Sequence, residues 1–251
     1  MKKTKNILYS DKHTQTLDIY LPDRADFRTI VYFHGGGLEG GDKAKINMAE
    51  VAERMCALGY GVVSANYRMY PTARFPDFLI DAADAVAYAA AHAREWGGNG
   101  ELLIAGQSAG AWMTLMLCMD EHYLRDVGID PSTIVGWISD SAQTTAHYNI
   151  QKYEHGEHKY AQRINEVAPL FFVGEDTAFS RMLLIFYDND MPCRPEQNML
   201  FYRAVLTFRP DADIEYKQLP GKHCHGSSKK DEDGEYAFIK TLADWLTRKN
   251  I

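Results

Sequence analysis

Short apolar runs alternate along the chain with longer stretches of helical composition. The short runs are rich in β-branched and aromatic residues, as is typical of buried strands; they occupy residues 16–21, 29–33, 61–65, 102–106, 133–138, 182–187 and 214–219. The longer stretches occupy residues 45–58, 78–96, 109–119, 196–208 and 236–248. This alternation predicts an α/β fold, with a mostly parallel sheet covered by helices on both faces. Residues 16–21 are expected to add antiparallel strands at one edge.

Residues 141–180 interrupt the alternation. They are rich in tyrosine, histidine and charge, and they are long for a bare connection between two strands. Long insertions in compact domains tend to be functional lids. We therefore expect one domain, residues 1–251, with a small cap inserted at about 141–180. His155 and His158 of this segment have the spacing of metal ligands, but a solvated helix explains them better, and no metal site is expected.

Composition narrows the class of partner. The chain has 251 residues, of which 46% are hydrophobic, and a formal net charge of -7. The negative charge argues against nucleic acid or an anionic membrane as the main partner. No run approaches the ~20 apolar residues of a membrane span, and the first residues lack the apolar core of a signal peptide. We expect a cytoplasmic protein, or an exported one if a leader has been removed, that acts on small molecules. A homodimer is one option for its assembly.

The stretch GQSAG, residues 106–110, follows the predicted strand at 102–106 directly. A G-x-S-x-G pattern at a strand-to-helix turn is typical of a nucleophile elbow, in which the flanking glycines let the serine stand clear of the sheet. The pattern alone also fits a serine that caps a helix. Ser108 is therefore a candidate nucleophile that needs further support from the rest of the chain.

The stretch HGGG, residues 34–37, follows an earlier predicted strand. Consecutive glycines allow backbone N–H groups to turn toward an anion, as an acyl-transfer enzyme requires for its oxyanion. We assign Gly36 and Gly37 as donors, together with the N–H of Ala109. His34 is expected to be structural. A phosphate-binding loop is disfavoured because its G-x-x-x-x-G-K-[ST] pattern is absent.

Together, HGGG and GQSAG resemble the α/β-hydrolase superfamily, in particular carboxylesterases like hormone-sensitive lipase and the acetyl-xylan or feruloyl esterases. The segment NYRMYPTARFPDFLIDAADAVAYA, residues 66–89, is similar to the D-Y-R-x-x-P…F-P…D segment of those families. Asn66 stands where they usually have Asp, and we expect the change to weaken a structural contact. The resemblance extends from about residue 17 to 246. It implies an α/β-hydrolase fold and a serine hydrolase acting on carboxylic esters.

This fold carries its acid after a later strand and its histidine after the last one. Asp188 and Asp190 follow the strand at 182–187, and His223 and His225 follow the strand at 214–219. Similarity to the corresponding loops of such esterases favours Asp190 as the acid and His223 as the base, with Asp188 and His225 as alternatives. The resulting mechanism proceeds through an acyl-enzyme and needs no metal or organic cofactor.

Aromatic side chains are expected to shape the substrate pocket. The candidates are Tyr70, Trp112 and Tyr148, together with Tyr153, Tyr160, Phe171 and Phe172. The cap lacks a long apolar lid, which favours short-acyl or aromatic esters over lipid droplets. The resemblance further implies esters of plant polysaccharides, so that the substrate is a small-molecule or oligosaccharide ester.

Two other kinds of function remain open. Another serine acyl hydrolase, such as an arylformamidase or a peptidase-like enzyme, would use the same three residues. A non-catalytic α/β-hydrolase that serves as a binding module usually lacks one of them, whereas this chain has a candidate for each. A serine-directed fluorophosphonate probe separates these classes, because a binding module should not react with it.

The four cysteines, Cys56, Cys118, Cys193 and Cys224, form no C-x-x-C pair, so reduced thiols are the default expectation. Cys193 and Cys224 follow the acid and histidine candidates, whose loops are neighbours in this fold. We therefore expect these two thiols to lie close together, with a disulfide as one option.

Overall fold

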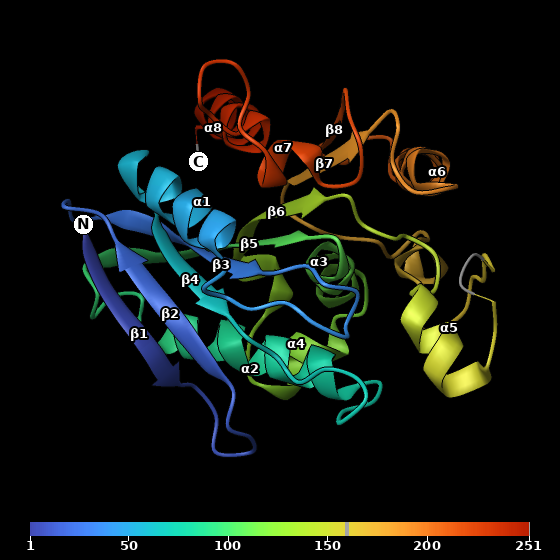
Figure 1. The fold of residues 1–251 in the computed structure, drawn as a ribbon, viewed down its shortest axis with the longest axis horizontal. Coiled ribbons are helices and arrows are strands. Elements are labelled where there is room, and N and C mark those ends of the chain that lie inside the picture. Colours follow the sequence, from blue (N-terminus) through green and yellow to red (C-terminus); the bar gives the residue numbers. More distant parts are fainter. Residues whose placement is uncertain (159–160, 251) are drawn as a thin grey trace.

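A computed structural model describes residues 1–158 and 161–250. Within these residues the strands form one eight-stranded sheet in the order β1-β2-β4-β3-β5-β6-β7-β8 (Figure 1). Pairing is parallel from β4 through to β8, whereas β1 and β2 are antiparallel to their neighbours. The strands are β1 (Lys2–Leu8), β2 (Thr16–Leu21), β3 (Phe27–Phe33), β4 (Gly61–Ala65), β5 (Gly98–Gln107), β6 (Ile134–Asp140), β7 (Met182–Tyr187) and β8 (Ile214–Leu219).

Helices cover both faces of the sheet, because the central strands present apolar side chains on both faces. In β3, Val31 and Phe33 pack into one core, and Ile30 and Tyr32 pack into the other. The helices α1 (Ile46–Ala57) and α8 (Ala237–Lys249) bury their apolar side chains on the second of these faces. The first face is covered by α2 (Asp77–His92), α3 (Ala109–Met119), α4 (His122–Asp126) and α6 (Arg194–Phe208).

The expected α/β architecture and its antiparallel edge are confirmed. The predicted bounds of β2, β4, β7, β8 and α3 coincide with the observed ones. Strand β1 was missed because most of its side chains are exposed and polar, so it has no apolar pattern. The helix predicted at residues 78–96 ends early, and β5 begins at Gly98, which pairs with Phe27.

The connection between β6 and β7 contains the helix α5 (Tyr148–His155) and the 3-10 turn η2 (Pro169–Phe172). His155 ends α5, and His158 lies just beyond it; both are exposed. The remaining short elements are η1 (Pro131–Thr133), before β6, and α7 (His225–Ser228), after β8. Among the helices that the structure describes, none has the length and apolarity required to cross a bilayer.

Candidate active site

Ser108 stands at the sharp turn between β5 and α3, at the carboxyl end of the sheet. Its φ of 54° is in the left-handed region, which a non-glycine residue adopts only under strain. The flanking glycines are required by space: a Cβ on Gly106 would come within 2.2 Å of the Gly110 carbonyl oxygen, and one on Gly110 within 2.1 Å of the Phe33 oxygen. The Ser108 N–H donates to the Asp140 carbonyl oxygen at 2.7 Å. This is the geometry of a nucleophile elbow.

The structure brings together Ser108, His223 and Asp190. The Ser108 Oγ lies 2.8 Å from His223 Nε2, and His223 Nδ1 lies 2.6 Å from Asp190 Oδ1. The same carboxylate oxygen accepts the Met191 N–H at 2.6 Å. An ionised carboxylate only accepts hydrogen bonds, so the proton of the neutral imidazole is on Nδ1, and Nε2 is left to accept the serine proton. The Asp190 side chain is fully buried, and that of His223 is 24% exposed.

The structure does not bring the two alternative residues into this chain of hydrogen bonds. Asp188 is exposed, and its Oδ1 accepts the Gly221 N–H at 2.9 Å. It therefore closes the turn that leads to His223, a usual task for an aspartate. His225 begins α7, and its ring packs against Gly221, where an added Cβ would meet His225 Cγ at 2.8 Å.

The HGGG loop, defined here as residues 34–41, approaches the elbow from β3. A Cβ on Gly35 would meet Ser108 Cβ at 3.1 Å. Gly36 and Gly37 have φ values of 128° and 67°, which favour glycine. Within the described part of the chain, no hydrogen bond engages the N–H of either residue. Ala109 is the first residue of α3, where a backbone N–H has no partner within the helix. The three N–H groups assigned from the sequence are thus next to Ser108 or to the residue that approaches it. Ala109 follows Ser108 in the chain, and Gly36 and Gly37 follow Gly35.

His34 supports this loop from within the protein. Its ring stacks on Tyr67 at a centroid distance of 4.5 Å, and the Tyr67 hydroxyl donates to the His34 carbonyl oxygen at 2.7 Å. The His34 Nδ1–H donates to the Gly35 carbonyl oxygen at 2.7 Å. Burial lowers the pKa of His34 to about 4, so the ring is neutral at physiological pH.

Asn66 keeps a full set of contacts, contrary to the weakened contact expected from the sequence. Its Oδ1 accepts the Lys43 N–H at 2.6 Å, and its Nδ2 donates to Asp42 Oδ2 at 2.9 Å. An aspartate at position 66 would place a carboxylate against that of Asp42. The amide is therefore the residue that fits this neighbour.

The aromatic candidates fall in different places. Tyr148 is half-buried, and its hydroxyl lies against Gly37, where an added Cβ would approach it to 2.4 Å. Trp112, by contrast, is in the core, fully buried, with its indole N–H donating to the Val167 carbonyl oxygen at 3.1 Å. Tyr70 is also buried and donates to Glu154 at 2.8 Å. Trp112 and Tyr70 are thus side chains of the protein interior. Tyr160 lies outside the described residues.

Exposure also separates the remaining aromatic candidates. Phe171 is 53% exposed, whereas Phe172 is partly buried against the core. Tyr153 stacks on Tyr70 with a centroid distance of 4.3 Å. Among the described aromatic residues of the β6–β7 connection, two contact the HGGG loop: Tyr148 at Gly37, and Tyr153, whose hydroxyl donates to Glu39 Oε1 at 2.6 Å.

Sequence reasoning missed a buried carboxylate beside the elbow. Asp140, the last residue of β6, is fully buried, and its side chain accepts hydrogen bonds from the Ser227 and Ser141 hydroxyls. Gln107 Nε2 donates to Ser227 Oγ at 2.6 Å, and the Cys224 N–H donates to Ser141 Oγ at 3.1 Å. Burial raises the pKa of Asp140 to about 6, against the opposing effects of Ser227 and His223. The position of Asp140 at the carboxyl end of a strand was the available signal.

A second missed residue is Arg194, at the start of α6. The guanidinium is buried, and its Nη1 donates to the Ser141 carbonyl oxygen at 2.8 Å. Burial lowers the pKa of Arg194, and the nearby negative charge of Asp190 opposes that shift. The arginine therefore supplies a positive charge behind the acid of the candidate triad. No signal in the sequence pointed to it, because its hydrogen-bond partner, Ser141, is distant in the chain.

The cysteines are all free thiols. Cys193 is exposed, whereas Cys224 is buried within the turn that follows His223. The disulfide option between them is therefore wrong for this structure.

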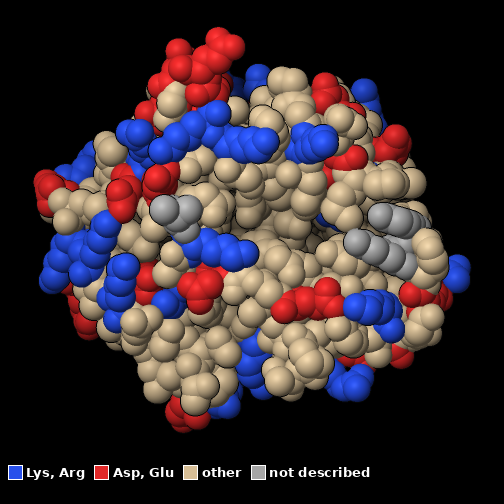
Figure 2. All heavy atoms as spheres, viewed as in Figure 1, with Lys and Arg blue, Asp and Glu red and all other residues tan. Residues whose placement is uncertain are grey.

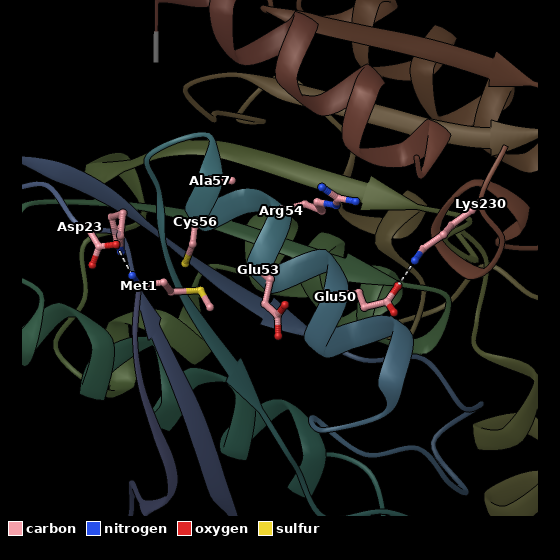
Figure 3. Close-up of a pocket in the computed structure, with 9 residues that line it drawn as sticks. Met1, Asp23, Glu50, Glu53, Arg54, Cys56, Ala57 and Lys230 are labelled. Atoms are coloured by element: carbon pink, nitrogen blue, oxygen red, sulfur yellow. Dashed lines mark hydrogen bonds and ion pairs between the residues drawn. The ribbon is translucent and has the colours of Figure 1, made fainter. Parts of the chain in front are cut away.

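The surface has a central hollow and a separate charged pocket. In Figure 2 charged side chains surround a hollow near the centre, whose visible walls are mostly uncharged. A separate pocket of ≈ 590 Å³ lies between α1 and the N-terminal strand region (Figure 3). Its charged walls pair with one another, as in the Glu50–Lys230 contact of 2.8 Å. The lining residues of this second pocket include none of Ser108, Asp190 and His223.

Comparison with known proteins gives a family for most of the chain. A family model described as BD-FAE matches residues 17–168. This range contains the HGGG loop and the elbow, whereas Asp190 and His223 lie beyond it. Esterase LipI of Mycobacterium tuberculosis is 34% identical over 113 residues, which cover 44% of this chain and 33% of that protein. The chain thus matches only about a third of the length of this curated relative.

Solved structures agree over nearly the whole chain. A truncated form of a carbohydrate esterase from gut microbiota has a TM-score of 0.80 at 18% identity, and the match covers 99% of this chain and 96% of the other. An esterase of Pyrobaculum calidifontis has a TM-score of 0.78 at 19% identity, with 100% and 86% covered. At such identities the likeness shows the fold, and the expected α/β-hydrolase fold is confirmed.

Proposed function

The chain belongs to the BD-FAE family, and from this premise we propose that it is a serine carboxylesterase that works through an acyl-enzyme. The observation that carries the proposal is the continuous path from Ser108 Oγ through His223 to Asp190, with contacts of 2.8 and 2.6 Å. A serine hydroxyl has little nucleophilicity until a base accepts its proton, and this path supplies one. The esterase names of LipI and of the two structural neighbours add support for ester substrates.

Acylation begins when Ser108 Oγ attacks the ester carbonyl carbon and its proton moves to His223 Nε2. The carbonyl π-electrons move onto oxygen, which receives hydrogen bonds from the N–H groups of Gly36, Gly37 and Ala109. Asp190 holds the Nδ1 proton in place and stabilises the imidazolium. When the tetrahedral intermediate collapses, the C–O bond to the alcohol breaks, and His223 returns its proton to the departing oxygen.

Deacylation repeats these steps with water. His223 takes a proton from the water as its oxygen attacks the acyl carbon, and the same N–H groups hold the second oxyanion. Collapse then breaks the bond to Ser108 Oγ, and the proton on His223 returns to the serine. The products are a carboxylic acid and the free enzyme, and none of the proposed steps requires a cofactor.

For the substrate, we propose esters with a short or an aromatic acyl group, including acetylated or feruloylated sugars. Tyr148 narrows the space beside Gly37, since its hydroxyl oxygen lies 2.4 Å from the position that a Cβ on that glycine would take. A wall so close to the expected oxyanion position favours a small acyl chain. The name of one structural neighbour, a carbohydrate esterase, adds support for a sugar as the alcohol.

The test is hydrolysis of p-nitrophenyl acetate, butyrate and octanoate by the wild type and by Ser108→Ala. We expect the acetate to react fastest and the alanine variant to lose activity by about 10⁶-fold, as is found when a catalytic serine is removed from another hydrolase. Acetylated xylan and methyl ferulate then test the natural alcohol and acid.

A fluorophosphonate probe supplies an independent readout for the same residue. It should label the wild type and leave Ser108→Ala unlabelled. If neither protein hydrolyses any of the esters and the probe does not react, the esterase proposal is wrong and a binding role takes its place.

A further inference from the structure

Helix α5 contacts the HGGG loop at Gly37. The Asn149 side-chain amide donates to the Gly37 carbonyl oxygen at 2.5 Å, and Asn149 is buried. Tyr148 touches the same glycine from its hydroxyl side. Because Gly37 adopts a φ of 67° and has no side chain of its own, its peptide orientation depends on such outside contacts.

One turn further along, α5 contacts the loop again. Lys152 Nζ lies 2.8 Å from Glu39 Oε1, and the Tyr153 hydroxyl donates to the same oxygen at 2.6 Å. Both partners of this second contact are accessible to solvent, so it contributes little on its own. As a second point of attachment, it restricts rotation of the helix about the Asn149 contact.

A third segment completes the arrangement. The Tyr70 N–H donates to the Leu38 carbonyl oxygen at 2.8 Å, so this residue is bonded to the HGGG loop. The Tyr70 ring stacks on Tyr153 at 4.3 Å, and its hydroxyl donates to Glu154 at 2.8 Å. The loop, the segment around Tyr70 and helix α5 are thus bonded in three pairs, and movement of α5 disturbs the loop by two routes.

From this arrangement we infer that helix α5 holds the HGGG loop in its catalytic conformation, with Asn149 as the positioning residue. The kinetic consequence rests on the proposed esterase function, because it assumes that the Gly36 and Gly37 N–H groups bind the oxyanion. The connection between β6 and β7 therefore does more than link two strands. It couples the position of a cap element to the stabilisation of the transition state.

The experiment compares Asn149→Ala with a matched variant, Asn198→Ala. Asn198 is also buried, and its side-chain amide donates to two backbone carbonyls, those of Ala142 at 2.8 Å and Arg194 at 2.9 Å. The two substitutions remove the same chemical group, but only Asn149 contacts the HGGG loop. Hydrogen exchange of the Glu39 and Gly40 amides, which both donate to the Gly36 carbonyl oxygen, reports on the loop. Hydrolysis of p-nitrophenyl acetate reports on catalysis.

We expect Asn149→Ala to exchange its loop amides about tenfold faster, in keeping with a locally weakened segment. Its kcat should fall about tenfold with KM nearly unchanged, a smaller loss than the 10²–10³-fold of deleting an oxyanion donor itself. Asn198→Ala should leave both quantities near the wild-type values. A general loss of stability would instead move both variants together.

Loop exchange that stays at the wild-type rate in Asn149→Ala would overturn the inference, and so would an equal acceleration in both variants. Failure of the esterase proposal looks different: the wild-type protein would then be inactive, while loop exchange would still decide whether α5 holds the loop. Asn149→Asp is the second variant, because it keeps the shape, removes the donor and places a carboxylate against the carbonyl oxygen.

Discussion

Each ring nitrogen of His223 has one partner, and this fixes the direction in which protons move. Asp190 occupies Nδ1, and Ser108 occupies Nε2. His225, two residues later, packs on Gly221 instead. The choice between the two histidines is thus made by the turn of the backbone at Cys224, whose φ is 55°. A left-handed residue between them sends the two side chains in different directions.

Paired substitutions should separate the residues that act from their neighbours. We expect His223→Ala to lower kcat/KM for p-nitrophenyl acetate by at least about 10⁴-fold, because it removes the base, and Asp190→Asn by about 10⁴-fold, because it permits the wrong tautomer. His225→Ala and Asp188→Asn should change it only severalfold. A large loss in His225→Ala with a folded protein would contradict the assignment of the base.

At the scale of the element, the turn after β8 is held by the end of β6. Asp140 accepts from Ser227 inside the turn, and Ser141 accepts the Cys224 N–H at 3.1 Å. Gln107, the residue before Ser108, donates to Ser227 as well. The strand that carries the nucleophile and the turn that carries the base are therefore joined through Ser227, whose hydroxyl donates in turn to a buried carboxylate.

Ser227 and the adjacent Ser228 offer a matched test of this connection. Ser228 is exposed and only accepts a 3.3 Å contact from Gln107. We expect Ser227→Ala to lower the free energy of unfolding by about 1–3 kcal/mol, because it removes a donor to a buried carboxylate, and to reduce kcat severalfold. Ser228→Ala should do neither. Urea unfolding and ester hydrolysis measure the two effects, and equal behaviour of the two variants would refute the connection.

The sequence predicted the elements that bear a periodic pattern and the residues that bear a motif. The central strands are apolar on both faces, and HGGG and GQSAG are short contiguous motifs, so both can be recognised in the sequence itself. Asp140, Arg194 and Asn149 were missed because their roles depend on partners about 50 or more residues away. The buried positions of Trp112 and Tyr70 were missed for the same reason. Tertiary packing decides whether an aromatic residue near the site in sequence lies in the core or at the surface.

At the scale of the whole molecule, buried titratable groups set the response to pH. His34 and His147 are both buried, and burial lowers the pKa of His34 to about 4 and that of His147 well below its usual value. Asp140 is the opposite case, because burial raises its pKa to about 6. The two histidines resist protonation in the folded state, whereas the aspartate resists ionisation.

The signs follow from proton counts in the two states. Between pH 6.5 and 4 the unfolded chain carries a proton on His34 that the folded protein lacks, so stability falls with falling pH, by about 3 kcal/mol over this window. Asp140 acts in the other direction. From about pH 6 to 4 the folded state binds the additional proton, so its contribution raises stability by a similar amount as the pH falls. The loss due to His147 is not offset, so we expect the protein to be less stable at pH 5 than at pH 7.5.

His147 allows this expectation to be isolated, because its Nδ1 accepts the Asn149 N–H at 3.3 Å and so caps helix α5. A protonated ring has no acceptor, so protonating His147 in the folded state would also break this cap, in keeping with its lowered pKa. His147→Asn keeps an acceptor suited to a helix N-terminus and does not titrate. Urea unfolding from pH 7.5 to 5 should give the variant a shallower decline, by up to about 1.4 kcal/mol per pH unit below pH 6.5, the value for one proton. Parallel declines in the two proteins would mean that His147 is not protonated more readily in the unfolded chain, and that the acid response originates elsewhere.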